Sequence, residues 1–237
     1  MRYLRNIPAR GFARGMGVLA LALGVLLSPV PAAAGESAGL IFTDRGPWAL
    51  GERELHWRLD HQGPDSPAFR QVRDGRVTLA EVTDPSDGQP LLEIRETGGE
   101  DSDGDPRVVG RFPVSSGDPM VVFFLENTAR DMAMLTGGSP FYIRNRMKEA
   151  LANAGPATQD ADGGVAVELR PFADDPNGDR MKGFETLRLR FVMGSDPARP
   201  IREFLAETDG PVAAISPEGM LPQPVAPAPY RHAMVLE

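Results

Sequence analysis

The chain of 237 residues contains no cysteine. It therefore has no disulfide bond, no thiolate metal ligand and no cysteine nucleophile. Its stability must come from a packed core of side chains rather than from covalent links. The lack of cysteine also excludes an acylated cysteine at a signal-peptide cleavage site, so we expect a mature protein without a lipid anchor.

Histidine is scarce, with only His56, His61 and His232 in the chain. His56 falls on the polar face of a predicted strand and His61 at the end of that strand, so we interpret both as surface residues. No H-E-x-x-H or H-x-H pattern is present, and G-x-S-x-G and phosphate-binding glycine motifs are also missing. We therefore predict no metal, no cofactor and no catalytic residue.

Basic residues are outnumbered, because 25 Lys and Arg stand against 33 Asp and Glu, for a formal net charge of −8. Such a chain is repelled by nucleic acid and by anionic lipid surfaces. Long apolar runs are also missing after residue 34, where the longest, Met120–Leu125, has only the length of a strand. We predict no nucleic-acid partner and no transmembrane segment in the mature chain.

Residues 1–34 have the layout of an export signal. Four arginines and no acidic residue accompany an apolar core at 17–27, and Ala32-Ala33-Ala34 supplies the small residues of a cleavage site. The core is too short to cross a bilayer, which takes about 20 residues. We predict a Sec-type signal peptide at 1–34, a mature protein that begins at Gly35, and a periplasmic location; an uncleaved anchor is the alternative.

Most of the remaining chain alternates apolar and polar residues, which is typical of strands with one buried face. The pattern is clear at Leu55, Trp57 and Leu59. Asp74-Gly75 is a common hairpin turn, and Met120–Leu125 is apolar on both faces, which favours a central strand. We predict strands at 54–60, 69–73, 76–83, 91–95, 107–114, 120–125, 165–170, 187–193 and 230–236.

Residues 126–154 change to the helical period. Residues 126–135 lack glycine and proline, and Gly137-Gly138 follows as a stop signal. Ser139 is a suitable N-cap, and Pro140 a suitable first residue, for a second helix that ends near residue 154. The buried stripe of this second helix is predicted at Ile143, Met147, Ala150, Leu151 and Ala154. A short helix is also predicted at Ile201–Glu207.

Together these elements predict a single α+β domain at 35–237. The predicted fold is a curved antiparallel sheet of about seven to nine strands, open or half-barrel-like, covered by the inserted helical hairpin. Residues 217–229 contain five prolines and are predicted to form an extended arm before the last strand at 230–236.

The turn between the two predicted helices is the candidate binding site. The N-terminus of a helix offers free N–H groups and the positive end of the helix dipole, which suit an anionic group. A plain capped turn between two helices is the structural alternative. We predict ligand binding by Gly137, Gly138, Ser139, Tyr142 and Arg144.

Two acidic loops resemble cation sites without meeting the required spacing. The loops at 101–105 and 175–179 place oxygen-bearing side chains at every second position. Both lack the glycine and the glutamate that an EF-hand needs at its sixth and twelfth positions. We interpret both as solvated turns.

The leading functional hypothesis is an exported, non-enzymatic protein that binds a small or apolar ligand, or an envelope protein, between the sheet and the helical hairpin. The methionine and phenylalanine residues suit an adaptable apolar cavity. The alternatives are a periplasmic hydrolase that uses paired carboxylates and an envelope assembly factor whose proline-rich arm and final strand engage another chain.

Overall fold

The computed structural model describes residues 36–43, 48–98, 105–114, 117–160, 162–196, 199–215 and 225–237. The predicted signal peptide at 1–34 and the predicted first mature residue, Gly35, lie outside these residues. So do most of the proline-rich arm and most of the acidic loop at 101–105.

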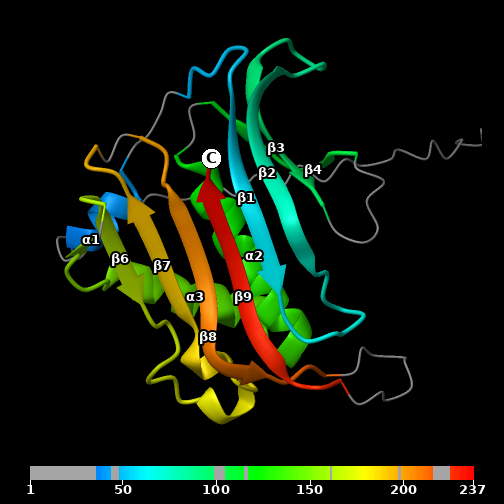
Figure 1. Cartoon of the computed structure of the whole chain (residues 1–237), viewed down its shortest axis with the longest axis vertical. Helices are drawn as coiled ribbons and strands as arrows, with labels where there is room; N and C mark the ends of the chain where they lie inside the picture. Colours follow the sequence, from blue (N-terminus) through cyan, green and yellow to red (C-terminus); the bar gives the residue numbers. More distant parts are fainter. Residues whose placement is uncertain are drawn as a thin grey trace, which may run out of the picture. The chain divides into compact units, whose positions relative to one another are not determined.

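The described chain is built on one antiparallel sheet of nine strands that does not close into a barrel (Figure 1). Its strands are β1 (Glu54–Gln62), β2 (Val72–Thr83), β3 (Pro90–Thr97), β4 (Arg107–Pro113), β5 (Thr158–Gln159), β6 (Val165–Leu169), β7 (Arg188–Met193), β8 (Glu203–Val212) and β9 (Ala228–Leu236). They lie in the order β4-β3-β2-β1-β9-β8-β7-β6-β5. Two meanders, β1 to β4 and β5 to β9, are therefore joined where the first strand pairs with the last.

A helical hairpin is inserted between the two meanders and covers one face of the sheet (Figure 1). The described helices are α1 (Glu36–Ile41), α2 (Pro119–Thr136), α3 (Pro140–Ala152) and two short 3-10 turns, η1 (Gly178–Arg180) and η2 (Phe184–Thr186). None of the described helices is both long enough and apolar enough to span a bilayer.

Aromatic rings fill the space between α2 and the sheet. Phe124 on α2 packs against Phe191 on β7 and Phe204 on β8, with ring centroids 5.7 Å and 5.4 Å away. All three side chains are fully buried. Burying such rings contributes about 1.5–3 kcal/mol each, so this layer is a main source of stability in a chain without disulfides.

The α+β fold and its helical hairpin confirm the predicted fold class. The alternation at Leu55, Trp57 and Leu59 places Trp57 and Leu59 in the core, as expected for β1. Ser139 caps α3 and Gly137 ends α2 with a φ of 74°, as predicted. The strands predicted near 54–60, 91–95, 107–114, 165–170, 187–193 and 230–236 are all present.

The predicted central strand at Met120–Leu125 is wrong, because these residues open helix α2. The side chain of Asp118 accepts a hydrogen bond from the backbone N–H of Met120 at 2.9 Å, and Pro119 occupies the first turn. An N-cap followed by proline is a helix-start signal. This helix-start signal outweighs the apolar run at 120–125, because a run of that length is compatible with either a strand or a helix.

The predicted hairpin at Asp74-Gly75 is also wrong, because β2 runs through both residues. Asp74 adopts a left-handed φ of 53°, beside a register irregularity between β1 and β2. A Cβ at Gly75 would lie 2.8 Å from the carbonyl oxygen of Thr97, so a glycine is needed for the close approach of β3. The Asp-Gly pair thus accommodates a bulge within a strand rather than a turn.

The predicted helix at Ile201–Glu207 is replaced by strand β8. This strand pairs with β7 on one side and β9 on the other, and Phe204 and Ala206 enter the core. The absence of glycine and proline allowed either structure locally. Pairing on both edges decides in favour of the strand.

Candidate functional site

A polar cluster lies at the junction of β1 and β9, on the sheet face that meets α2. His61 on β1 is the register partner of His232 on β9, and their ring centroids are 4.9 Å apart. Directly opposed residues of antiparallel strands share a face of the sheet. Asp131 on α2 completes the cluster from the helical layer, with its Oδ2 2.7 Å from Nε2 of His61.

The alternation of side chains along β1 and β9 explains why the two histidines lie on the same face of the sheet. His61 continues the inward positions of Trp57 and Leu59 on β1, and His232 lies between the inward residues Tyr230 and Met234 on β9. In a strand every second side chain points to the same face, so both histidines face the core.

On α2, the buried face supplies the carboxylate. Phe124, Thr128, Asp131 and Leu135 recur at spacings of four, three and four residues, and all four are buried. This spacing forms one stripe of a helix. Asp131 therefore projects toward the sheet at the level of the two histidines.

Hydrogen bonds connect the members of the cluster. Oδ2 of Asp131 accepts hydrogen bonds from Nε2 of His61 at 2.7 Å and from the hydroxyl of Tyr230 at 2.8 Å. The hydroxyl of Thr128 donates to the carbonyl of Phe124 at 2.9 Å and lies 3.4 Å from Nδ1 of His232.

Burial sets the charge states of two members. His232 is 2% exposed, and its burial, together with the nearby His61, lowers its pKa well below the usual 6.5. Burial and the Asp131 carboxylate raise the pKa of Tyr230 well above 10. At neutral pH His232 is therefore an uncharged imidazole with a free lone pair, and Tyr230 is a hydrogen-bond donor.

The cluster contains a donor set for a metal ion. The ligand atoms of His61, Asp131 and His232 all lie within 4.8 Å of one another. Ligands of one zinc ion lie within about 4 Å of one another, since each is about 2 Å from the metal. Small side-chain adjustments therefore suffice. Two imidazole nitrogens and one carboxylate oxygen suit divalent transition metals.

Sequence motifs do not reveal this cluster, because its members come from three separate elements. Metal-binding motifs place their ligands close together along the chain. One signal in the sequence does point to an inward His61: it lies two and four residues after Leu59 and Trp57, which are inward positions of the same strand. Its position at the end of the strand favoured the surface instead. His61 is partly buried, with 13% of its side chain exposed, so its interpretation as a surface residue is wrong.

The residues of the predicted anion site all have structural contacts. Gly137 caps α2, Gly138 donates its N–H to Thr136, and Ser139 caps α3. The guanidinium of Arg144 pairs with Glu126 at 2.9 Å, so its charge is already compensated. Tyr142 is turned to Asp175. This geometry gives the anion site no support, and that site stays a prediction.

The second acidic loop is committed to hydrogen bonds within the protein. The Asp175 carboxylate is fully buried, accepts hydrogen bonds from the Tyr142 hydroxyl and the backbone N–H of Asn177, and pairs with Arg146 at 2.7 Å. These bonds outweigh burial and hold the pKa of Asp175 below 3.8. The network fastens α3 to the loop that follows β6.

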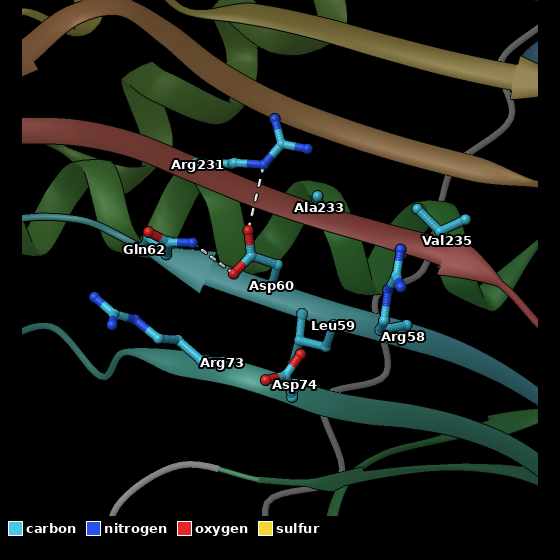
Figure 2. A pocket seen from close by; sticks show the side chains of 9 residues that line it. All are labelled: Arg58, Leu59, Asp60, Gln62, Arg73, Asp74, Arg231, Ala233 and Val235. Carbon is cyan, nitrogen blue, oxygen red and sulfur yellow. Dashed lines mark hydrogen bonds and ion pairs between the residues drawn. The ribbon is translucent and has the colours of Figure 1, made fainter.

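On the opposite face of β1 and β9 lies an open groove of about 360 Å³ (Figure 2). Figure 2 shows Asp60 between Arg231 and Gln62, with ion-pair and hydrogen-bond distances of 3.4 Å and 2.7 Å. Arg58 and Arg73 also line the groove and are exposed. Its walls are largely solvated charged side chains, which fix a ligand far less well than the buried cluster does.

The buried cluster is therefore the strongest candidate site among the described residues. Comparison with known proteins gives it no independent identification: no protein-family model matches the chain, and no curated protein matches it.

Proposed function

We propose that this chain is an exported, non-enzymatic protein that binds a divalent transition-metal ion through His61, Asp131 and His232. The observation that supports the proposal is the convergence of two imidazoles and one carboxylate within 4.8 Å, at a buried position between the sheet and α2. The proposal replaces the sequence-based expectation of no metal, which did not consider these three residues together.

Binding of a metal ion at the cluster displaces a proton from it. The metal takes the place of the proton between His61 and Asp131, and the imidazole of His232 supplies a second nitrogen. Since His232 is neutral at physiological pH, its lone pair is available without a further deprotonation. The Tyr230 hydroxyl holds the Asp131 carboxylate in place, as hydrogen bonds to metal ligands commonly do.

A large apolar ligand is disfavoured by the packing of the interior. Phe124, Phe191 and Phe204 are fully buried and in contact at the centre of the layer between α2 and the sheet. Entry of a lipid-like ligand would require these rings to move, and interiors packed to crystal density resist such expansion. A single ion needs only side-chain adjustments within the cluster.

The alternative explanation is that the cluster serves only as a polar clasp between α2 and the sheet. Buried hydrogen-bonded groups do fix the position of one element on another in some proteins. A clasp needs a hydrogen-bonded pair, such as His61 with Asp131. It does not account for a second neutral imidazole facing the first, so the metal proposal explains more of the geometry.

Titration with zinc tests the proposal directly. The purified mature chain is stripped with a chelator, and zinc binding is followed by calorimetry and by the thermal unfolding midpoint. We expect the midpoint to rise with zinc, because free zinc at 100 times its Kd stabilises the folded state by about 2.7 kcal/mol. Manganese and cobalt are tested in parallel. An unchanged midpoint and no binding heat for all three ions would contradict the proposal.

Matched variants locate the site. Asp131→Asn and His232→Gln keep side-chain size and are expected to weaken zinc binding by more than about tenfold. His56→Gln is the control, because His56 lies on β1 but is 37% exposed and contacts Thr78 rather than the cluster. Equal loss of affinity in all three variants would place the zinc site elsewhere.

A further inference from the structure

The loop that connects β1 to β2 covers the cluster. Phe69, from this loop, stands edge-on to His61 with ring centroids 4.6 Å apart, and its ring is 6.0 Å from that of Tyr230. Phe69 is itself 6% exposed. An apolar ring thus lies directly against two members of the polar cluster.

The most exposed member of the cluster is the one that Phe69 covers. The side chain of His61 is 13% exposed and that of Asp131 8%, whereas His232 as a whole residue is 2% exposed. His61 is therefore the member of the cluster with most contact to solvent. The ring of Phe69 packs against it.

The loop segment 63–69 packs on the protein through the buried residues Gly63, Pro64, Ser66 and Phe69, but it pairs with no strand. Its backbone hydrogen bonds are internal: Ser66 N–H donates to the Pro64 carbonyl, and Phe69 N–H donates to the Ser66 carbonyl. Across the described chain, no backbone hydrogen bond joins this segment to another element. Arg70 anchors its far end by contacts with Glu96 and the Gly98 carbonyl. Opening of the segment would expose its buried residues but would break no backbone hydrogen bond of the sheet.

Gly63 provides the space that lets the ring close. A Cβ at this position would lie 2.8 Å from the Phe69 ring, closer than real side-chain carbons approach each other. The loop therefore begins with a residue whose lack of a side chain allows Phe69 to rest against His61.

We infer that Phe69 is the gate of the metal site and that local opening of residues 63–69 admits and releases the ion. This inference rests on the proposed metal binding. Phe69 supplies no ligand atom, so its ring controls the rates of binding and release. Kd depends on the ligands and is nearly independent of the ring.

The test compares zinc release from the wild-type chain and from Phe69→Ala. Each protein is loaded with zinc and mixed with excess chelator, and release is followed with a zinc indicator. We expect release and uptake to be faster by about tenfold or more in Phe69→Ala, with Kd changed by less than about threefold. Phe141→Ala is the control, because Phe141 lies on α3 and is 72% exposed.

A readout without metal checks the same gate. Diethyl pyrocarbonate acylates accessible neutral imidazoles, and we expect His61 and His232 of the metal-free protein to react faster in Phe69→Ala than in the wild type. Phe69→Leu, which keeps apolar bulk at this position, replaces the alanine variant if circular dichroism shows that alanine prevents folding.

The possible outcomes separate the two proposals. If the wild type binds zinc and Phe69→Ala releases it at the wild-type rate, the gate is wrong and the metal site stands. If the wild type binds no zinc, both are overturned. Faster release together with a large loss of affinity would assign Phe69 a structural role instead of a gating role.

Discussion

At the scale of single residues, His232 links the candidate site to stability. It lies between His61, Asp131 and Thr128, in a position that favours the neutral imidazole. The unfolded chain takes up a proton at this residue near its ordinary pKa of 6.5, whereas the folded chain does not until lower pH. The contribution of His232 to stability is therefore complete above pH 6.5 and declines as the pH falls below it.

We accordingly predict that the metal-free protein loses stability between pH 7.5 and pH 5.5 and that His232→Gln reduces this loss. The measurement is the urea midpoint across that range in the presence of a chelator. His56→Gln is the matched control, because His56 lies on β1 outside the cluster. A His232→Gln curve parallel to the wild type would show that another group is responsible.

At the scale of elements, the helical hairpin shows what a periodic pattern can predict. The stripe on α3 was placed correctly: Ile143, Met147 and Leu151 are each no more than 2% exposed. The pattern succeeds for α3 because Gly137 marks the end of α2 and Ser139 marks the start of α3. Local signals and burial agree here, so the sequence suffices.

We predict that Leu151→Ala destabilises the protein by about 2–5 kcal/mol, because Leu151 is 1% exposed and its removal leaves a cavity. Lys148→Ala, on the exposed face of the same helix, should change stability by less than about 0.5 kcal/mol. Urea midpoints of the two variants check this difference. Small and equal effects would mean that the core collapses around the deletion.

The elements that were predicted wrongly share a cause. For Met120–Leu125, Asp74-Gly75 and Ile201–Glu207 the local pattern was compatible with two structures. For Met120–Leu125 the neighbouring Asp118 cap decided in favour of a helix. For the other two a partner distant in sequence decided: the close approach of β3 at Asp74-Gly75, and pairing with β7 and β9 at Ile201–Glu207. The candidate site was missed for a related reason, since its ligands belong to β1, α2 and β9.

At the scale of the whole molecule, the remaining prediction concerns export. The basic start, short apolar core and small residues at 32–34 predict cleavage after Ala34. N-terminal sequencing of protein recovered from the periplasmic fraction should begin at or near Gly35. Recovery of the intact chain from the cytosol would contradict the signal-peptide assignment.

The pairing of β1 with β9 has a consequence for how the chain folds. The final strand of the protein forms the middle of its sheet, so the two halves are joined only after residues 228–236 are available. Contacts between the start and the end of a chain form slowly, because a long loop must close first. Under the proposed export, late closure would prolong the time in which the unfolded chain can still pass through a membrane channel.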